Sequence, residues 1–168
     1  MISFVFSKKL IVTIPKNNNM SLSLKYLSKN RRDLTFSVEK LKNKLRQCPE
    51  ILFAYILGSA VNGVIKSKSD LDLGIYLENS KTSFGDVYLK ICNICEPILP
   101  GVRIDVGFLN KCEDPVYKFE VISGSLLFTK NKEIWLRFYS NTAREYEHQM
   151  VHYEKQRRYR IQSRLAAE

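Results

Sequence analysis

The chain has 168 residues, enough for one domain with a hydrophobic core and too few for two domains of ordinary size. Its 27 Lys and Arg residues outnumber the 17 Asp and Glu residues, which gives a formal net charge of +10. No apolar run approaches the roughly 20 residues that a membrane-spanning helix needs, and Lys8 and Lys9 interrupt the apolar start, so we expect neither a membrane segment nor a signal peptide.

The first 33 residues form a basic N-terminal extension. Residues 1–50 hold 11 Lys and Arg against 3 Asp and Glu, whereas residues 51–129 hold 7 against 9 and residues 130–168 hold 9 against 5. Residues 1–19 are either an extra strand or a misassigned start, because more ordinary sequence opens at Met20. The basic flanks suit nucleic acid, a nucleotide or an acidic protein surface, or are simply solvated helix faces.

Residues 34–168 are expected to form one domain in which helices alternate with strands. Hydrophobic periodicity and Gly or Pro stops define its elements. In chain order we predict a helix over 34–47, a strand over 51–57, a turn with a short helix over 58–63, a strand over 71–77, a helix over 84–98, a strand over 102–109, a helix over 115–123, a short strand over 125–129 and a long helix from about 132 to 165. Asp114 and Pro115 suit the N-cap and first turn of the third long helix. The alternation predicts an α/β or α+β domain with a central sheet.

The four cysteines and two histidines form no recognisable metal-binding pattern. Cys92 and Cys95 make one CxxC pair, but a zinc site would need a second pair at similar spacing. His148 and His152 are four residues apart, yet Gln149 stands where the metalloprotease pattern requires Glu. We therefore expect free thiols in a reducing cytoplasm, and histidines on a solvated helix face.

Two carboxylates stand at the start of the second predicted strand. Asp70 and Asp72 are two residues apart, so their side chains point to one face, while Leu71 and Leu73 point into the core. Asp105, between apolar residues of the next predicted strand, joins them if the two strands are neighbours. Three carboxylates supply the hard oxygen ligands that Mg²⁺ prefers. Two such ions would activate an attacking oxygen and stabilise a leaving pyrophosphate.

The turn after the first predicted strand suits the binding of the phosphate groups from which that pyrophosphate would leave. Gly58 lets a phosphate approach the backbone, N–H groups at the start of the helix favour an anion, and Ser59 adds a hydroxyl donor. The Walker A pattern GxxxxGK[ST] is absent. A lone DxD is most often a solvated strand end. The combination is a much more specific pattern: Gly-Ser, then ten residues, then DxD, then an isolated Asp in the next apolar strand.

These residues resemble the DNA polymerase β nucleotidyltransferase superfamily. The resemblance rests on Gly58-Ser59, on Asp70-Leu71-Asp72 and on the stretch RIDV that contains Asp105, and it covers about residues 34–146. The compact size and the stretches GSAVNG, SDLDLGIYL and RIDVGFLN are similar to the minimal nucleotidyltransferases (MNT). These are often antitoxins paired with a HEPN-domain RNase toxin. One departure is Asn62, where many members carry Arg or Lys; Lys66 or Lys68 is available to replace that charge.

The resemblance implies a polymerase-β-like fold, with a central mixed sheet flanked by helices and a long C-terminal helix, and a Mg²⁺-dependent nucleotidyltransferase. It implies nucleotide-phosphate contacts from Gly58 and Ser59, and a catalytic centre in which Asp70, Asp72 and Asp105 bind two Mg²⁺ ions. Asp105, in the more apolar setting, is the candidate general base or ligand of the catalytic metal. The implied reaction is transfer of AMP from ATP to a tyrosine hydroxyl of a cognate HEPN-type toxin in a hetero-oligomer. Direct nucleic-acid binding is not expected.

Two alternatives stay open. Transfer to a small molecule, such as an aminoglycoside, is chemically similar, but the chain is short for a second substrate-binding domain. A non-catalytic antitoxin would instead block its toxin by contact and keep a vestigial nucleotide site. For an antitoxin, we expect the long C-terminal helix to carry the partner surface, although two of its aromatic residues, Trp135 and Phe138, are expected to pack on the sheet.

Overall fold

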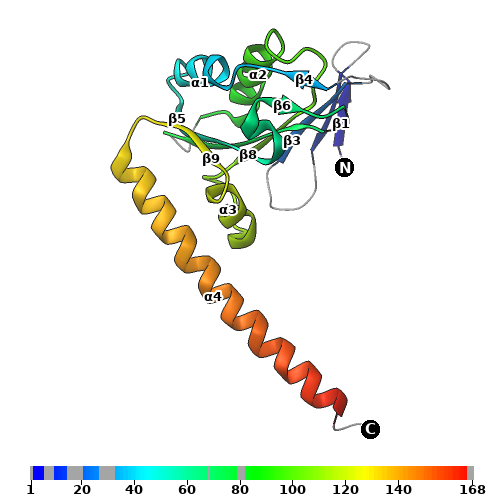
Figure 1. The fold of residues 1–168 in the computed structure, drawn as a ribbon, viewed down its shortest axis with the longest axis vertical. Helices are drawn as coiled ribbons and strands as arrows, with labels where there is room; N and C mark the ends of the chain where they lie inside the picture. The colour runs from blue at the N-terminus through cyan, green and yellow to red at the C-terminus, as the bar shows by residue number, and fades with distance from the viewer. Residues whose placement is uncertain are drawn as a thin grey trace.

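The computed structural model describes strand segments 2–5, 10–14 and 21–26 and residues 33–67, 69–78 and 82–165. Strands and helices alternate along most of the described chain, and one long helix projects from the body (Figure 1). The elements are β1 (Ile2–Val5), β2 (Leu10–Ile14), β3 (Ser21–Tyr26), β4 (Leu34–Thr35), α1 (Val38–Arg46), β5 (Ile51–Ile56), the 3-10 helix η1 (Gly58–Asn62), β6 (Val64–Ile65), β7 (Leu71–Leu77), α2 (Phe84–Cys95), β8 (Ile104–Phe108), α3 (Pro115–Ile122), β9 (Ser125–Thr129) and α4 (Lys132–Leu165).

The main sheet is mixed, as predicted. Its seven strands lie in the order β1-β2-β3-β8-β7-β5-β9, and β4 and β6 form a separate two-stranded sheet. Strands β7 and β8 pair in parallel, whereas the other neighbours in the main sheet are antiparallel. Strand β3 pairs with the free edge of β8 and so joins the N-terminal segment to the sheet. The parallel β7–β8 pair therefore lies inside the sheet, with neighbours on both sides.

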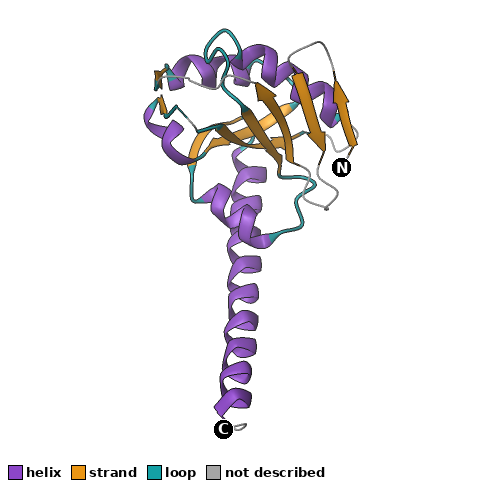
Figure 2. Ribbon diagram, turned by 90° about the vertical axis from the view of Figure 1, so that its right-hand side faces the viewer, coloured by secondary structure: helices purple, strands orange, loops and turns teal. Residues whose placement is uncertain are grey.

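Helices cover both faces of the sheet (Figure 2). Leu71 and Leu73 of β7 are buried in a core shared with α1 and α2, which confirms their predicted inward direction. The opposite face packs on α3 and on the first part of α4, through Val121 and Phe138 among others. Because side chains alternate along a strand, the residues between the leucines of β7 face α3.

Most predicted elements are confirmed, with differences at helix ends. Helix α1 begins at Val38 instead of residue 34, because the Ser37 side chain accepts a hydrogen bond from Lys40 N and so caps it. Residues 34–35 pair with β6 as a short strand. Helix α2 ends at Cys95, and a turn follows. Asp114 caps α3 as predicted, and all four cysteines are free thiols.

The first half of helix α4 packs on the body. Trp135 Nε1 donates a hydrogen bond of 2.7 Å to the Tyr55 hydroxyl, and the Phe138 ring lies 5.4 Å from the Phe53 ring. This confirms the predicted packing of Trp135 and Phe138 on the sheet. Farther along, Val151 is 69% exposed and Tyr159 is 61% exposed, and the helix leaves the body (Figures 1 and 2). Among the described helices, none is long and apolar enough to cross a membrane.

Candidate functional site

The parallel pairing of β7 and β8 brings two of the three predicted aspartates together. Asp72 and Asp105 are direct Cα partners in the register, so their side chains leave the same face of the sheet. Their strand neighbours Leu71, Leu73 and Ile104 are buried in the core on the other face. The sequence pattern of carboxylates backed by apolar residues thus becomes one polar position on an otherwise apolar pair of strands.

Asp70 stands one step before β7 and is held by a cation. Its Oδ2 lies 3.4 Å from Arg103 Nη1, and each side chain is about one-third exposed. The backbone supports this contact, because Leu71 N donates a 2.8 Å hydrogen bond to Arg103 O. Sequence reasoning gave Arg103 no role. The available signal was its spacing: it lies two residues before Asp105, as Asp70 lies two residues before Asp72.

The Gly-Ser turn lies beside the aspartate pair. Strand β5 ends next to β7, where Leu57 N donates a 3.1 Å hydrogen bond to Asp72 O. Gly58 follows with a φ of +62°, and a Cβ there would lie 3.9 Å from Asp72 Oδ2. Left-handed backbone of this kind favours glycine. Gly58 and Ser59 are exposed, so the turn presents its backbone and the Ser59 hydroxyl to solvent beside the carboxylates.

The carboxylates repel one another. The pKa of Asp72 is raised to about 6, first by partial burial and then by the carboxylates of Asp105 and Asp70, while Arg103 works in the opposite direction. One guanidinium therefore does not balance the negative charge gathered here. A cationic ligand at this position would relieve the repulsion.

The carboxylate oxygens at this position match part of the ligand set that a divalent cation needs. Asp72 and Asp105 are adjacent carboxylates on one face, the ligand type that Mg²⁺ takes. Asp70, the third predicted ligand, contacts Arg103 instead. Among the described residues, no group of three or more His, Cys, Asp or Glu side chains is arranged to hold a metal ion. Convergence of all three aspartates therefore stays a prediction.

Helix α3 forms the wall of the site, and the sequence analysis missed its role. Gly74 and Gly107 lie two residues after Asp72 and Asp105 and are register partners. A Cβ at Gly74 would be 2.3 Å from Val121 Cγ1, and one at Gly107 would be 2.0 Å from the Tyr117 hydroxyl. The glycines thus let α3 approach the sheet. The repeated Asp-x-Gly in two successive strands was the signal for this close approach.

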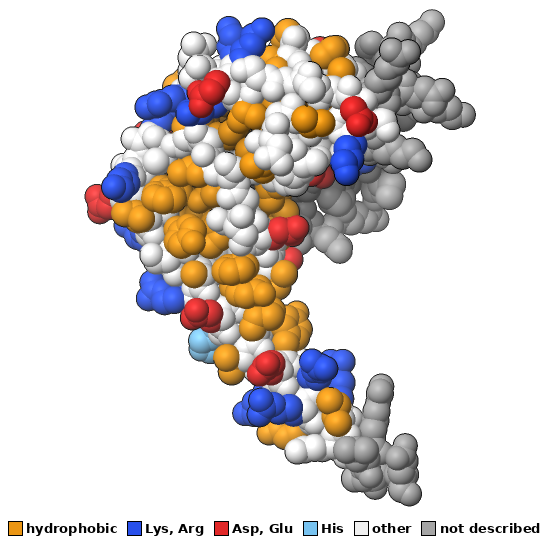
Figure 3. Space-filling view, viewed as in Figure 1, with side chains coloured by type: hydrophobic (Ala, Val, Ile, Leu, Met, Phe, Trp, Pro, Cys, Tyr) orange, Lys and Arg blue, Asp and Glu red, His pale blue; other side chains and the backbone are white. Residues whose placement is uncertain are grey.

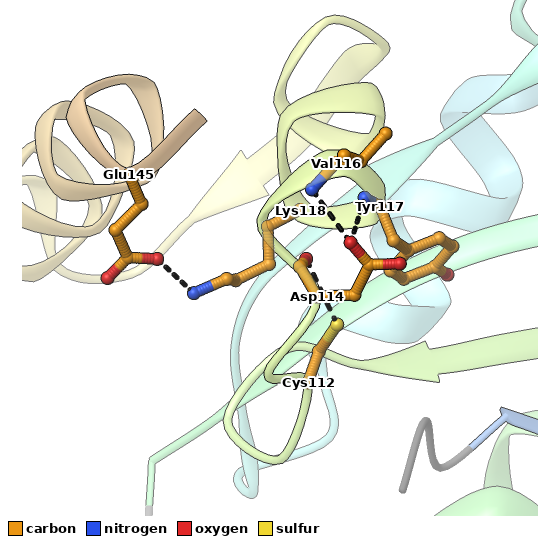
Figure 4. Close-up of polar contacts among 6 residues, drawn as sticks. All are labelled: Cys112, Asp114, Val116, Tyr117, Lys118 and Glu145. Atoms are coloured by element: carbon orange, nitrogen blue, oxygen red, sulfur yellow. Dashed lines mark hydrogen bonds and ion pairs between the residues drawn. The ribbon is translucent and has the colours of Figure 1, made fainter. Parts of the chain in front are cut away.

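Tyr117 is the residue of α3 that rests on Gly107, two residues beyond Asp105. Burial raises the pKa of its hydroxyl, and the carboxylates of Asp105 and Asp72 raise it further. The Asp114 cap fixes the first turn of α3, accepting hydrogen bonds from Val116 N and Tyr117 N at 2.9 and 3.4 Å (Figure 4). Tyr117 is therefore a neutral hydroxyl held in place beside the carboxylates.

Solved structures share this fold. A toxin–antitoxin with AMP-PNP matches at 19% identity with a TM-score of 0.56, covering 68% of this chain and 90% of that chain. The toxin–antitoxin MntA–HepT matches at 17% identity with a TM-score of 0.51, covering 68% of this chain and 87% of that chain. A tri-AMPylated Shewanella oneidensis HEPN toxin in complex with MNT antitoxin matches at 16% identity with a TM-score of 0.52. The match covers 68% of this chain and 91% of that chain. At these identities the likeness concerns the fold.

Sequence comparison identifies the family. No curated protein sequence matches the chain significantly. The family described as "Polymerase beta, Nucleotidyltransferase" matches residues 39–133, which is more than half of the chain and includes every candidate site residue from Gly58 to Asp105. The chain therefore belongs to the polymerase β nucleotidyltransferase family.

Proposed function

We propose that this protein is a Mg²⁺-dependent nucleotidyltransferase and the antitoxin of a HEPN-type RNase toxin, to which it transfers AMP from ATP. The acceptor is a tyrosine hydroxyl of the toxin. The observation that carries the proposal is the register of Asp72 with Asp105 beside the Gly58 turn, in a chain of the nucleotidyltransferase family. The toxin as partner is supported by the shared fold with antitoxins described in complex with HEPN toxins.

Each group of the site has a task in this reaction. Gly58 and Ser59 bind the triphosphate through the backbone and a hydroxyl. The acceptor oxygen attacks the α-phosphorus, the bond from that phosphorus to the bridging oxygen breaks, and pyrophosphate leaves. Asp105 takes the proton of the acceptor hydroxyl. Arg103 holds Asp70 at the edge of the site.

Carboxylates of this site would hold the Mg²⁺ ion. Asp72 and Asp105 would hold it, with Asp70 as a third ligand if its side chain turns from Arg103. When bound, Mg²⁺ neutralises triphosphate charge and stabilises the developing charge in the transition state. The repulsion that raises the pKa of Asp72 favours binding of such a cation.

The experiment uses labelled ATP, Mg²⁺ and the product of the neighbouring gene. That gene should encode a small helical protein with an RxxxxH motif. We expect label on a tyrosine of this partner, loss of its RNase activity, and a strongly reduced rate of labelling with Asp72→Asn. An Asp72→Asn protein that still neutralises the toxin without labelling it would favour the non-catalytic antitoxin. Labelling of an aminoglycoside but not of the toxin would favour the small-molecule enzyme.

A further inference from the structure

Tyr117 occupies a defined place relative to the aspartate pair. A Cβ built at Gly107 would lie 2.0 Å from the Tyr117 hydroxyl oxygen and 2.8 Å from its Cζ. The ring end therefore rests directly on the backbone of β8. Gly107 is two residues beyond Asp105 on the same face, so the hydroxyl lies over the next position of that face along β8.

The hydroxyl and the phosphate turn lie on opposite sides of the carboxylates. Across the sheet, β5 with the Gly58 turn comes first, then β7 with Asp72, then β8 with Asp105. Tyr117 stands over β8. In phosphoryl and nucleotidyl transfer the attacking and leaving oxygens are roughly in line through phosphorus. If pyrophosphate leaves at Gly58 and Ser59, the attacking oxygen enters from the side of Tyr117.

The Tyr117 hydroxyl can still form a hydrogen bond. Within the part of the chain that the structure describes, it has no hydrogen-bond partner, and it is not among the buried atoms that lack one. Tyr117 is half-buried, so its hydroxyl is not sealed in the core. A phenol hydroxyl both donates and accepts, so it suits another hydroxyl as a partner.

The helix that carries Tyr117 is held at its start and along its middle. The Asp114 carboxylate caps its start, and Lys118 forms an ion pair with Glu145 of α4 (Figure 4). The Phe119 ring stacks on the Tyr146 ring with centroids 3.9 Å apart. A group on so constrained a helix loses little freedom when it binds a substrate.

We propose that the Tyr117 hydroxyl hydrogen-bonds the acceptor hydroxyl and aligns it with the α-phosphorus, so that Tyr117 positions the acceptor and not the nucleotide. This inference rests on the proposed transfer reaction. It assigns to α3 a role that the three aspartates and the Gly-Ser turn do not fill.

The test is Tyr117→Phe in the full chain, which keeps the ring on Gly107 and removes only the hydroxyl. Two quantities are measured: the Kd of a non-hydrolysable ATP analogue with Mg²⁺, and the initial rate of labelling against toxin concentration. We expect an unchanged nucleotide Kd and a fall of about tenfold in kcat/KM for the toxin, the effect of one neutral hydrogen bond. Tyr76→Phe is the matched control, because Tyr76 lies on the same face four residues beyond Asp72 and stacks on Phe53.

The outcomes separate this inference from the proposed function. Unchanged kcat/KM in Tyr117→Phe, with wild-type labelling intact, overturns the positioning role alone. A weaker nucleotide Kd that accounts for the whole loss also overturns it, because the hydroxyl would then bind ATP. If wild-type protein labels no toxin, the proposed function is wrong and the inference fails with it. An equal loss in Tyr76→Phe would mean that the effect is a general one of this face.

Discussion

Asp72 and Asp105 are Cα partners in the parallel β7–β8 pair, and both face α3. Two carboxylates side by side destabilise each other unless a cation lies near them. The Asp70–Arg103 contact supplies one cation at the edge of this cluster. At Asp72 the repulsion from Asp105 and Asp70 outweighs the attraction of Arg103, and the first two predictions follow from that charge balance.

Transfer should depend on the aspartates in a graded way. Asp72→Asn or Asp105→Asn should lower the rate of labelling about 10²-fold or more, because cation binding and charge neutralisation are worth several kcal/mol in such reactions. Asp70→Asn should lower it in the same way if Asp70 joins the site.

Ser59→Ala should have a smaller effect. It should lose roughly 1.5–3 kcal/mol of transition-state stabilisation, the value of one charge-assisted hydrogen bond, because the backbone N–H groups remain. Labelling rates are measured in one series with labelled ATP and the toxin. Wild-type rates in Asp72→Asn would contradict the enzymatic function.

The fold itself should gain stability when the repulsion is removed. The folded pKa of Asp72 is about 6 against an ordinary 3.8, so the contribution of Asp72 to stability falls as pH rises through this window and is lowest above pH 6. In EDTA at pH 7.5, Asp72→Asn should raise the free energy of unfolding by about 1 kcal/mol, a value reduced for solvent screening. The gain should shrink towards pH 4.

Urea unfolding followed by circular dichroism measures this difference. Glu113→Gln, a charge removal at an exposed loop position, is the control for a general effect of net charge. Added Mg²⁺ should stabilise the wild type more than Asp72→Asn, because only the wild type keeps both carboxylates of the pair. A wild type that Mg²⁺ leaves unchanged would argue against a cation site at Asp72 and Asp105.

The close approach of α3 should be detectable as a coupling between two residues. Gly74→Ala would place a Cβ 2.3 Å from Val121 Cγ1 and should destabilise the fold by about 1–3 kcal/mol through overpacking. Val121→Ala removes that atom and leaves Val121 Cβ as the nearest atom at 3.5 Å, an ordinary contact. The double variant should therefore be more stable than the sum of the single effects predicts. Strict additivity in a double-mutant cycle would show that α3 does not rest on Gly74.

Much of this arrangement could be predicted from the sequence, because it depends on local periodicity. The strand Leu71–Leu77 has its predicted bounds, since alternating and buried positions are readable along seven residues. The adjacency of β7 and β8 was a condition of the sequence analysis and not a prediction, and their parallel pairing meets that condition. The Asp114 cap followed from Asp-Pro chemistry.

What could not be predicted depends on contacts between distant elements. Strands β4 and β6 have two residues each, too few for a periodic pattern. The Arg103 contact to Asp70 requires the β7–β8 register, which no single segment encodes. Tyr117 reaches the site only because Gly107 leaves room under α3, and the sequence shows this packing only as the repeated Asp-x-Gly, which does not say which element lies on the glycines.

The distal part of α4 should bind the toxin and contribute little to folding. Residues 151–163 are exposed and carry Lys155, Arg157, Arg158 and Arg160 against one acidic residue, Glu154. Basic and hydrophobic side chains both appear along this end of the helix in Figure 3. Arg and Tyr are frequent anchors of protein interfaces. An acidic surface of the toxin is the partner that this charge favours.

Deletion of residues 151–168 should therefore weaken toxin binding and leave the body intact. This truncation keeps Tyr146 stacked on Phe119 and Trp135 bonded to Tyr55, so the free energy of unfolding should change by no more than about 0.5 kcal/mol. Binding is measured by titration calorimetry at two salt concentrations, with Arg157→Glu/Arg160→Glu in the full chain as a second variant that keeps the helix. Both variants should bind more weakly, and the charge reversal should reduce the salt dependence. A truncated chain that loses its cooperative unfolding would assign this end of α4 to the fold, and unchanged affinity in both variants would place the toxin elsewhere on the protein.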